Sequence, residues 1–166
     1  GCSNLPSWQV VESQWISKSM GLNRFVSCQD EYNILNRNVE AELIPAMQKY
    51  GCGLLPYFPL ASGLLTGKYK RTEMPEGARL TDMPTFANRI YLTDENFDIV
   101  DNLNKFAHKT GHSILELAFG WMASRPTTAS IIAGATKPEQ IDANVAAVSW
   151  VLSQSEIDEV DKISAK

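Results

Sequence analysis

The sequence lacks several features that would assign a protein to a class at once. Its 166 residues carry a net charge of −4 and contain no run of Lys and Arg, which argues against a nucleic-acid-binding surface. No apolar stretch approaches the ~20 residues that a membrane-spanning helix needs. The N-terminus has no basic segment followed by an apolar run, so we expect no secretory signal peptide. We therefore expect a protein that binds neither nucleic acid nor membrane.

Cysteine is scarce, and its spacing is uninformative for metal binding. The sequence holds Cys2, Cys28 and Cys52, an odd number of widely separated residues without a CxxC pair. No group of His, Cys, Asp and Glu residues has the spacing of a metal site. We interpret the three cysteines as reduced structural thiols and expect a cytoplasmic protein.

Length and composition indicate one globular domain covering residues 1–166. A hydrophobic content of 44% and a charged content of 20% are ordinary for such a domain. Gly1 falls in the middle of a predicted strand-to-loop junction, which is an unusual place for a chain to begin. We therefore expect either a fragment or the ordered part of a longer chain.

Short apolar runs alternate with helical patterns along the chain. Continuous runs of this kind suit strands that are covered on both faces, as in parallel sheets. Alternating strands and helices predict βα units. Pro56 weakens the second run, because proline cannot donate to a sheet ladder. The predicted strands span 24–29, 53–57 and 129–133.

The first three helices are predicted from apolar spacing. The helix from Ser7 to Met20 would bury one side, formed by Val10, Val11, Trp15 and Ile16. A helix over 38–50 would bend or restart at Pro45. A third would begin at Thr93, bury Phe97, Val100, Leu103 and Ala107, and stop at Gly111.

Three later helices have start signals of the capping-box type. In this motif a Ser or Thr hydroxyl and a Glu three residues later each satisfy an unpaired backbone N–H. The pattern occurs at Ser113–Glu116, Thr136–Glu139 and Ser153–Glu156. The last of these helices is predicted to bury Ile157, Val160 and Ile163.

Polar and aromatic residues stand where the predicted strands end. Gly134 and Thr136, between a strand and a helix start, would offer backbone N–H groups to an anion such as a phosphate, and Lys137 would add positive charge. Many βα loops carry such residues for structural reasons alone. Tyr57 would present a flat face to an aromatic ligand, or would simply be a core tyrosine.

Carboxamides at two further strand ends, Asn4 and Gln29, would bond another amide or cap the following loop. In a parallel barrel the carboxyl ends of the strands form the face where sites are built. The coincidence of four such ends favours a site. The segment 58–92 is too long for a tight connection, and long loops in compact domains tend to be functional.

Taken together, four segments resemble the aldo-keto reductases, in particular the bacterial oxidoreductase branch that includes the potassium-channel β subunits. The segments are 1–4, 25–33, 57–68 and 134–144, in the family's order. The resemblance implies an α/β fold of the (β/α)8 TIM-barrel type that binds NADP(H). The chain would then be the C-terminal half, from the end of strand five through strand eight and the C-terminal helix.

The resemblance also implies cofactor roles, residue by residue. Ser3, Asn4 and Gln29 would bond the nicotinamide carboxamide, and Tyr57 would stack on the nicotinamide ring. The pyrophosphate would be lined by Pro59, Leu60, Ser62 and Gly63, with Lys68 and Arg79 near the phosphates. Arg79 would also pair with the 2′-phosphate. The 2′-phosphate and adenine end would be held by Gly134, Thr136, Gln140 and Asn144.

Two positions depart from the family pattern. Ala143 stands where a glutamate often precedes the final asparagine, so adenine recognition is expected to be weaker. Phe58 replaces a commoner serine, which removes a hydroxyl contact and makes the site more apolar.

The family's catalytic Asp, Tyr, Lys and His have no counterparts in this chain, because they belong to the first four strands. His108 and His112 flank a predicted helix end and are expected to have surface or capping roles. We therefore predict no catalytic residue here.

Three functional hypotheses follow. The first is an NADP-dependent enzyme that reduces aldehydes or ketones, of which this chain is the cofactor-binding half. The second is a regulatory module that resembles a β subunit and binds NADP(H) without turnover. The third is a half barrel that pairs with a copy of itself. Because a half barrel has unpaired edges, its partner would be the missing N-terminal half or a self-copy.

Overall fold

A short parallel sheet lies at one end of the molecule. The computed structural model describes residues 1–82 and 90–166. Strands β1 (Cys2–Ser3), β2 (Ser27–Gln29) and β3 (Gly53–Leu54) pair in the order β1-β2-β3. All pairs are parallel, with Cys2 opposite Cys28 and Cys28 opposite Leu54. Consecutive strands are thus neighbours, as in a succession of βα units.

The predicted strands are correctly placed but shorter than expected. Only 27–29 of the predicted 24–29 and 53–54 of the predicted 53–57 form strands. The predicted strand 129–133 is wrong as a continuous strand, since this part of the chain forms only isolated bridges, from Thr128, just before it, to Leu54 and from Ile132 to Tyr57. Pro56 lies between these two bridges and has no N–H for the ladder, although its carbonyl accepts from Ile132.

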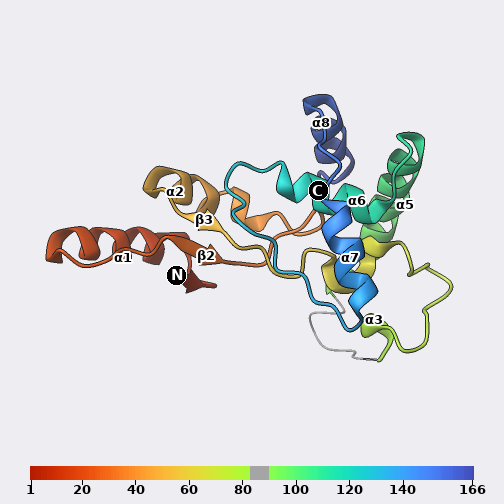
Figure 1. The fold of residues 1–166 in the computed structure, drawn as a ribbon, viewed down its shortest axis with the longest axis horizontal. Helices are drawn as coiled ribbons and strands as arrows, with labels where there is room; N and C mark the ends of the chain where they lie inside the picture. Colours follow the sequence, from red (N-terminus) through yellow and green to blue (C-terminus); the bar gives the residue numbers. More distant parts are fainter. Residues whose placement is uncertain (83–89) are drawn as a thin grey trace.

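The helices and 3₁₀ segments follow the predicted alternation. In Figure 1, α1 and α2 lie together beside the strands, while α5, α6, α7 and α8 gather at the other end of the molecule. Their bounds are α1 Ser7–Met20, η1 Asn38–Glu40, α2 Leu43–Tyr50, η2 Ala61–Thr66, α3 Arg79–Asp82, α5 Asp94–Lys109, α6 Ile114–Ala123, α7 Pro138–Ala147 and α8 Gln154–Ile163.

The predicted helix over 38–50 is two elements, the 3₁₀ turn η1 and the helix α2. Pro45 is the third residue of α2. An N–H at that position has no acceptor within the helix, so proline is tolerated there and marks the start of the helix. Gly51, with φ of 63°, ends α2 as predicted.

Two of the three predicted capping boxes are confirmed. Ser113 and Ser153 each accept from the backbone of a glutamate three residues later and receive the reciprocal bond. The box at Thr136 is wrong. Lys137 occupies the cap position of α7 and makes no side-chain cap bond. The proline that follows it is preorganised for a first helical position, which shifts the start by one residue.

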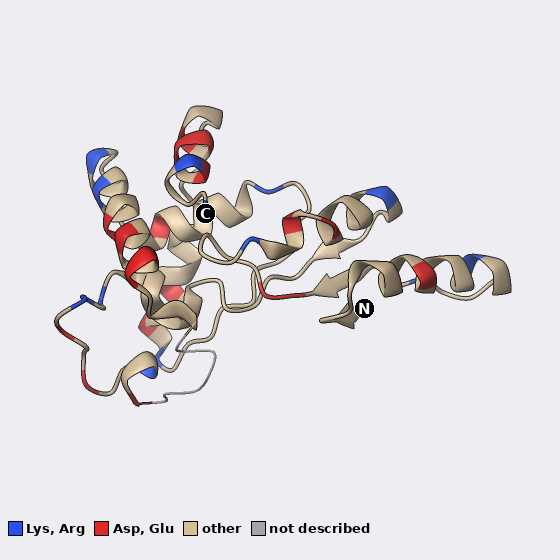
Figure 2. Cartoon of the chain, turned by 180° about the vertical axis from the view of Figure 1, so that it is seen from behind, with Lys and Arg blue, Asp and Glu red and all other residues tan. Residues whose placement is uncertain are grey.

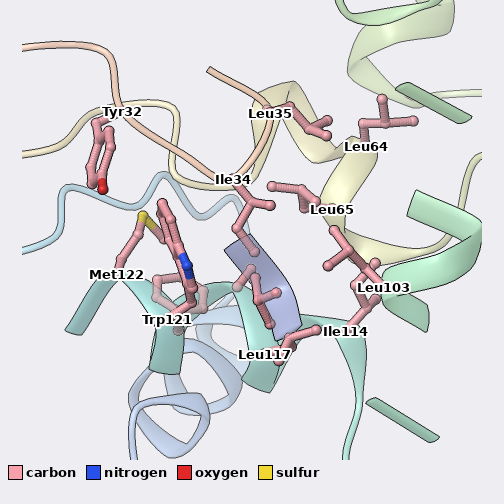
Figure 3. Packing of buried hydrophobic residues seen from close by; sticks show 14 of the residues in the cluster. Tyr32, Ile34, Leu35, Leu64, Leu65, Leu103, Ile114, Leu117, Trp121 and Met122 are labelled. Atoms are coloured by element: carbon pink, nitrogen blue, oxygen red, sulfur yellow. The ribbon is translucent and has the colours of Figure 1, made fainter. Parts of the chain in front are cut away.

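The hydrophobic core centres on α6 and the helices around it. The predicted face of α5 is confirmed, since Phe97, Val100, Leu103 and Ala107 are buried. Figure 3 shows Leu65 and Leu103 among the closely packed side chains of this core. Trp121 of α6 is fully buried, and its ring lies 5.3 Å from that of Tyr32. The core therefore holds the segments that follow β2 and β3 against α6.

Helix α1 contradicts the prediction of a buried apolar side. Val10 is buried, but Trp15 and Ile16 are 57% and 46% exposed. Figure 2 shows that α1 carries few charges, so much of its surface is apolar or neutral. An amphipathic pattern predicts that one face of a helix is buried, but it does not identify the segment that buries it. Within the part of the chain that the structure describes, no helix has the length and apolar character to cross a membrane.

The cysteines and histidines lie away from any metal-like arrangement. Cys28 and Cys52 are buried and Cys2 is half-buried, all as free thiols. Burial raises the pKa of the Cys28 thiol, which keeps it protonated. The His112 ring stacks on that of Trp150, with ring centres 3.9 Å apart, and its Nδ1 lies 3.2 Å from Glu116, the glutamate of the Ser113 capping box. In α8, Val160 is fully buried, whereas Ile157 and Ile163 are half-buried.

Candidate functional site

Tyr57 follows β3 and is held from three sides. Its N–H donates to the Asp30 carbonyl at 3.1 Å, and its own carbonyl accepts from Tyr32 at 3.4 Å. Its hydroxyl donates to Oδ1 of Asn4 at 2.8 Å. Burial, followed by the carboxylates of Glu31 and Asp30, raises the pKa of Tyr57. The phenol therefore stays protonated and half-buried, with its ring fixed at the end of the sheet.

The predicted carboxamide contacts lie beside this tyrosine. Ser3 Oγ donates to the Gln29 carbonyl at 2.7 Å, and Asn4 Nδ2 donates to Ser3 Oγ at 3.2 Å. The Asn4 N–H also reaches the Gln29 carbonyl, at 3.3 Å. Asn4 has a φ of 54°, an uncommon conformation that asparagine tolerates. The structure thus brings Ser3, Asn4, Gln29 and Tyr57 together at the carboxyl ends of three strands.

The segment after Tyr57 has a left-handed backbone at several positions. The φ angles of Phe58, Ala61 and Ser62 are 52°, 49° and 57°, and that of Gly63 is 99°. Each non-glycine residue in this region costs about 1–2 kcal/mol, and such strain clusters at functional sites. Within this segment the N–H groups of Ala61 and Gly63 donate to the carbonyls of Phe58 and Leu60, at 2.9 and 2.8 Å. We call residues 57–63, with Pro59 and Leu60 inside them, the corner.

Side chains at the corner are packed unevenly. Ser62 is only 9% exposed and Ala61 is fully buried, so a ligand would meet the backbone here rather than the serine hydroxyl. A Cβ on Gly63 would lie 3.3 Å from Cε of Lys68 and 3.4 Å from the ring of Tyr69. These contacts are tight but involve the flexible end of Lys68, so the φ of 99° is what favours glycine at position 63.

Two cations flank the corner. The ammonium of Lys68 lies next to Gly63 and 5.1 Å from the centre of the Tyr69 ring. The guanidinium of Arg79, at the start of α3, lies 5.4 Å from the centre of the Phe58 ring. Phe58 therefore provides an aromatic face for the arginine, in addition to the lost hydroxyl and the more apolar site that were expected from the sequence. Both residues are exposed.

The segment 134–144, called here the end segment, is held mainly by local bonds. The N–H and hydroxyl of Thr136 both donate to Oε1 of Gln140, at 2.7 and 3.2 Å. A Cβ on Gly134 would meet nothing within 4 Å, so the space beside it is open. Asn144 lines a groove of about 510 Å³ between α6, α7 and residues 128–133. These four predicted residues form a second, more exposed group.

A buried polar network beneath the corner was not predicted from the sequence. Asn33 is fully buried and donates to the Phe58 carbonyl and to the hydroxyl of Tyr91. Tyr91 in turn bonds Glu31. No local motif signals these contacts, because Asn33 and Tyr91 are 58 residues apart. Residues 83–89, part of the predicted functional segment 58–92, lie outside the described residues.

The arrangement suits an organic dinucleotide better than a metal. The corner offers a flat aromatic ring and a strained backbone, and its neighbours Asn4, Lys68 and Arg79 add a carboxamide and two cations; these groups match a nicotinamide ring, its amide and a pyrophosphate. Among residues 1–82 and 90–166, no three His, Cys, Asp or Glu side chains are grouped so as to hold a metal ion. The donor set therefore fits a nicotinamide cofactor.

Comparison with known proteins identifies a family to which this sequence is similar. The family model for the aldo/keto reductase family matches residues 1–165. Over 99% of its length the chain is 38% identical to 51% of a probable voltage-gated potassium channel subunit beta from Oryza sativa subsp. japonica. Over 88% it is 35% identical to 44% of an NADH-specific methylglyoxal reductase from Escherichia coli strain K12.

The chain spans about half the length of the curated relatives it matches. The match nevertheless covers nearly all of this sequence, including both groups of site residues. By this match, the chain belongs to the aldo/keto reductase family.

Proposed function

We propose that this chain supplies the cofactor-binding part of an NADP(H)-dependent oxidoreductase that reduces aldehydes or ketones. The observation that carries the proposal is the cluster of Asn4, Gln29 and Tyr57 at the strand ends. In it, an aromatic ring, the Asn4 carboxamide and the Gln29 backbone carbonyl lie near a left-handed backbone segment that Lys68 and Arg79 flank. Reductase relatives in the same family support a carbonyl substrate.

Each group of residues has a defined task in this proposal. NADPH would supply the hydride, and this chain's own side chains would hold the cofactor in place. Tyr57 would support the nicotinamide ring, and Ser3, Asn4 and Gln29 would bond its carboxamide. Asn4 would exchange its bond with the Tyr57 hydroxyl, 2.8 Å long, for one to the cofactor. The proton needed by the carbonyl would come from residues outside this sequence.

The phosphates would lie between the corner and the end segment. Backbone groups of Pro59, Leu60, Ser62 and Gly63 would line the pyrophosphate, with Lys68 beside them. Arg79, Gly134, Thr136, Gln140 and Asn144 would hold the 2′-phosphate and the adenine. The proposed preference for NADPH over NADH rests on the cations Lys68 and Arg79. This preference should be measured, because one relative is an NADH-specific reductase.

The chain is proposed to be the C-terminal half of a (β/α)8 barrel, completed by an N-terminal half. Relatives about twice as long support this assignment. So do apolar side chains left open on two helices, among them Trp15 of α1, 57% exposed, and Val145 of α7, 67% exposed. Pairing with a self-copy would cover the same surfaces. A cytoplasmic location is proposed on the basis of the free thiols.

A second candidate function is a regulatory module that binds NADP(H) without turnover. The specific observation in its favour is that probable potassium channel β subunits from two plants are 38% and 34% identical to this chain. Both functions use the same cofactor site. They differ only in whether bound NADPH is consumed.

One experiment separates these possibilities. The natural full-length polypeptide is titrated with NADPH and then assayed for NADPH consumption with methylglyoxal and glyceraldehyde. Saturable binding with NADPH consumption supports the reductase. Saturable binding without NADPH consumption in the presence of either carbonyl supports the regulatory module. No saturable binding at millimolar NADPH overturns the proposal in both forms.

A further inference from the structure

Asn33 lies directly behind the corner and is fully buried. Its Nδ2 donates to the Phe58 carbonyl and to the Tyr91 hydroxyl, both at 3.0 Å. Its Oδ1 accepts the N–H groups of Leu35 and Asn36, both at 2.9 Å. A carboxamide has two donors and two acceptor sites, so every hydrogen-bonding position of Asn33 is used. This side chain is therefore fixed in one orientation.

Phe58 needs such support more than most residues. Its φ of 52° is in the left-handed region, which a bulky side chain rarely adopts. A strained conformation persists only where surrounding contacts hold it. The bond from Asn33 fixes the carbonyl of Phe58, and hence the peptide plane that joins Phe58 to Pro59, immediately after Tyr57.

Tyr91 and Glu31 hold Asn33 from the other side. Tyr91 is 3% exposed, and its hydroxyl donates to Oε1 of Glu31 while accepting from Asn33. The same Glu31 oxygen accepts from Asn36 Nδ2 at 3.0 Å. Burial raises the pKa of Tyr91, so its hydroxyl keeps the proton it donates. The network runs continuously from Glu31 through Tyr91 and Asn33 to Phe58.

We propose that Asn33 is a positioning residue for the cofactor site. By holding Phe58 in its left-handed conformation, it keeps the neighbouring Tyr57 ring where the nicotinamide would lie, without contacting the cofactor. This inference rests on the proposed function of Tyr57. It predicts that Asn33 acts on the nicotinamide end of the ligand and spares the phosphate and adenine end.

The test uses two ligands and three variants of the natural full-length polypeptide. Asn33→Asp keeps the acceptor for Leu35 and Asn36 but replaces the donor that faces the Phe58 carbonyl. Asn33→Leu is a neutral replacement of similar size. Tyr91→Phe is a graded variant, because it removes one support of Asn33 and leaves the bond from Asn33 to Phe58. The ligands are NADPH and 2′-phospho-ADP-ribose, which lacks nicotinamide.

The expected result is a split between the ligands. Asn33→Asp should lower the affinity for NADPH about tenfold or more and abolish the fluorescence change of the bound nicotinamide. Its affinity for 2′-phospho-ADP-ribose should change less than about threefold. Tyr91→Phe should weaken NADPH binding less than Asn33→Asp does, because the bond from Asn33 to Phe58 remains, and should change affinity for the fragment less than about threefold. Between pH 8 and pH 5 the Asn33→Asp defect should shrink, because a protonated carboxyl regains a donor.

Other outcomes overturn the inference. Equal weakening of both ligands, or loss of folding in both Asn33 variants by circular dichroism, would make Asn33 a general stabiliser. Unchanged NADPH affinity in a folded variant would remove its role altogether. Failure of the wild-type protein to bind NADPH is a separate result, which contradicts the proposed function itself.

Discussion

Tyr57 after β3 and Thr136 before α7 both follow extended segments, yet they are held by different kinds of contact. Tyr57 is bonded to residues that precede it by 25 to 53 positions, at Tyr32, Asp30 and Asn4. Thr136 bonds Gln140 within its own segment. A site held by long-range contacts is formed before the ligand arrives, whereas an exposed local turn has fewer contacts to fix it.

This difference in contacts predicts different behaviour at the two ends of the proposed site. The corner lies on the hydrophobic core, since Leu64 and Leu65 behind it are fully buried. The end segment lies in the open, where residues 134–140 are exposed. We infer that the nicotinamide end of the site is preorganised and that the adenine end becomes ordered when the cofactor binds.

The largest expected effect comes from removing support beneath the corner. Leu65→Ala should lower the free energy of unfolding by about 2–5 kcal/mol, because Leu65 is fully buried and its removal leaves a cavity. Gln140→Ala in the end segment should change it by no more than about 0.5 kcal/mol. Urea denaturation of both variants measures the contrast. Equal losses would show that the two ends are equally embedded.

A smaller effect is expected from removing the ring at the corner. Tyr57→Ala should weaken NADPH binding by about 1–3 kcal/mol, or roughly five- to 150-fold, because stacking on the nicotinamide is lost. Tyr50→Ala, at the end of α2, provides the control and should leave affinity unchanged. Fluorescence titration measures both. An unaffected affinity in Tyr57→Ala would remove the ring from the site.

The end segment should show a smaller and more selective effect. Gln140→Ala removes the acceptor for the N–H and hydroxyl of Thr136 and should weaken NADPH by about 1 kcal/mol, roughly fivefold. The ratio of NADPH to NADH affinity should fall with it, because the 2′-phosphate is proposed to lie here. Paired titrations with the two cofactors test this. A loss of equal size for both would place the 2′-phosphate elsewhere.

The smallest effect concerns pH. The pKa of Tyr57 is raised, mainly by burial, above the ordinary tyrosine value of about 10. A raised pKa means that the stability gained from the neutral phenol is complete below the unfolded value and is lost as pH rises through the folded value. The stability difference between wild type and Tyr57→Phe should therefore be constant from pH 7 to 9 and decline above about pH 10. Denaturation at several pH values measures it, and a decline below pH 9 contradicts the assignment.

Local signals were enough to predict much of the fold. The apolar spacing of α5 and the capping boxes at Ser113 and Ser153 depend on residues within a few positions of one another, and all three are confirmed. The Thr136 box failed because a proline one residue further on favoured a later start. Strand lengths were overestimated, since a strand needs a paired neighbour as well as an apolar run.

Long-range features could not be predicted from the sequence. Trp15 and Ile16 form an apolar pair on α1, but no local pattern says whether a partner covers them. The site residues were placed by resemblance, and the structure brings Asn4, Gln29 and Tyr57 together. The network through Asn33 stayed hidden because its partners are distant in sequence and common in type.

Hydrogen exchange with and without NADPH, measured on the natural full-length polypeptide, tests the central claim most directly. The account predicts slow exchange at residues 57–67 before NADPH is added and little change afterwards. It predicts fast exchange at residues 134–144 in the free protein and strong protection in the complex. Protection confined to other regions, or no change at residues 134–144 under saturating NADPH, would contradict a cofactor site that joins the corner to the end segment.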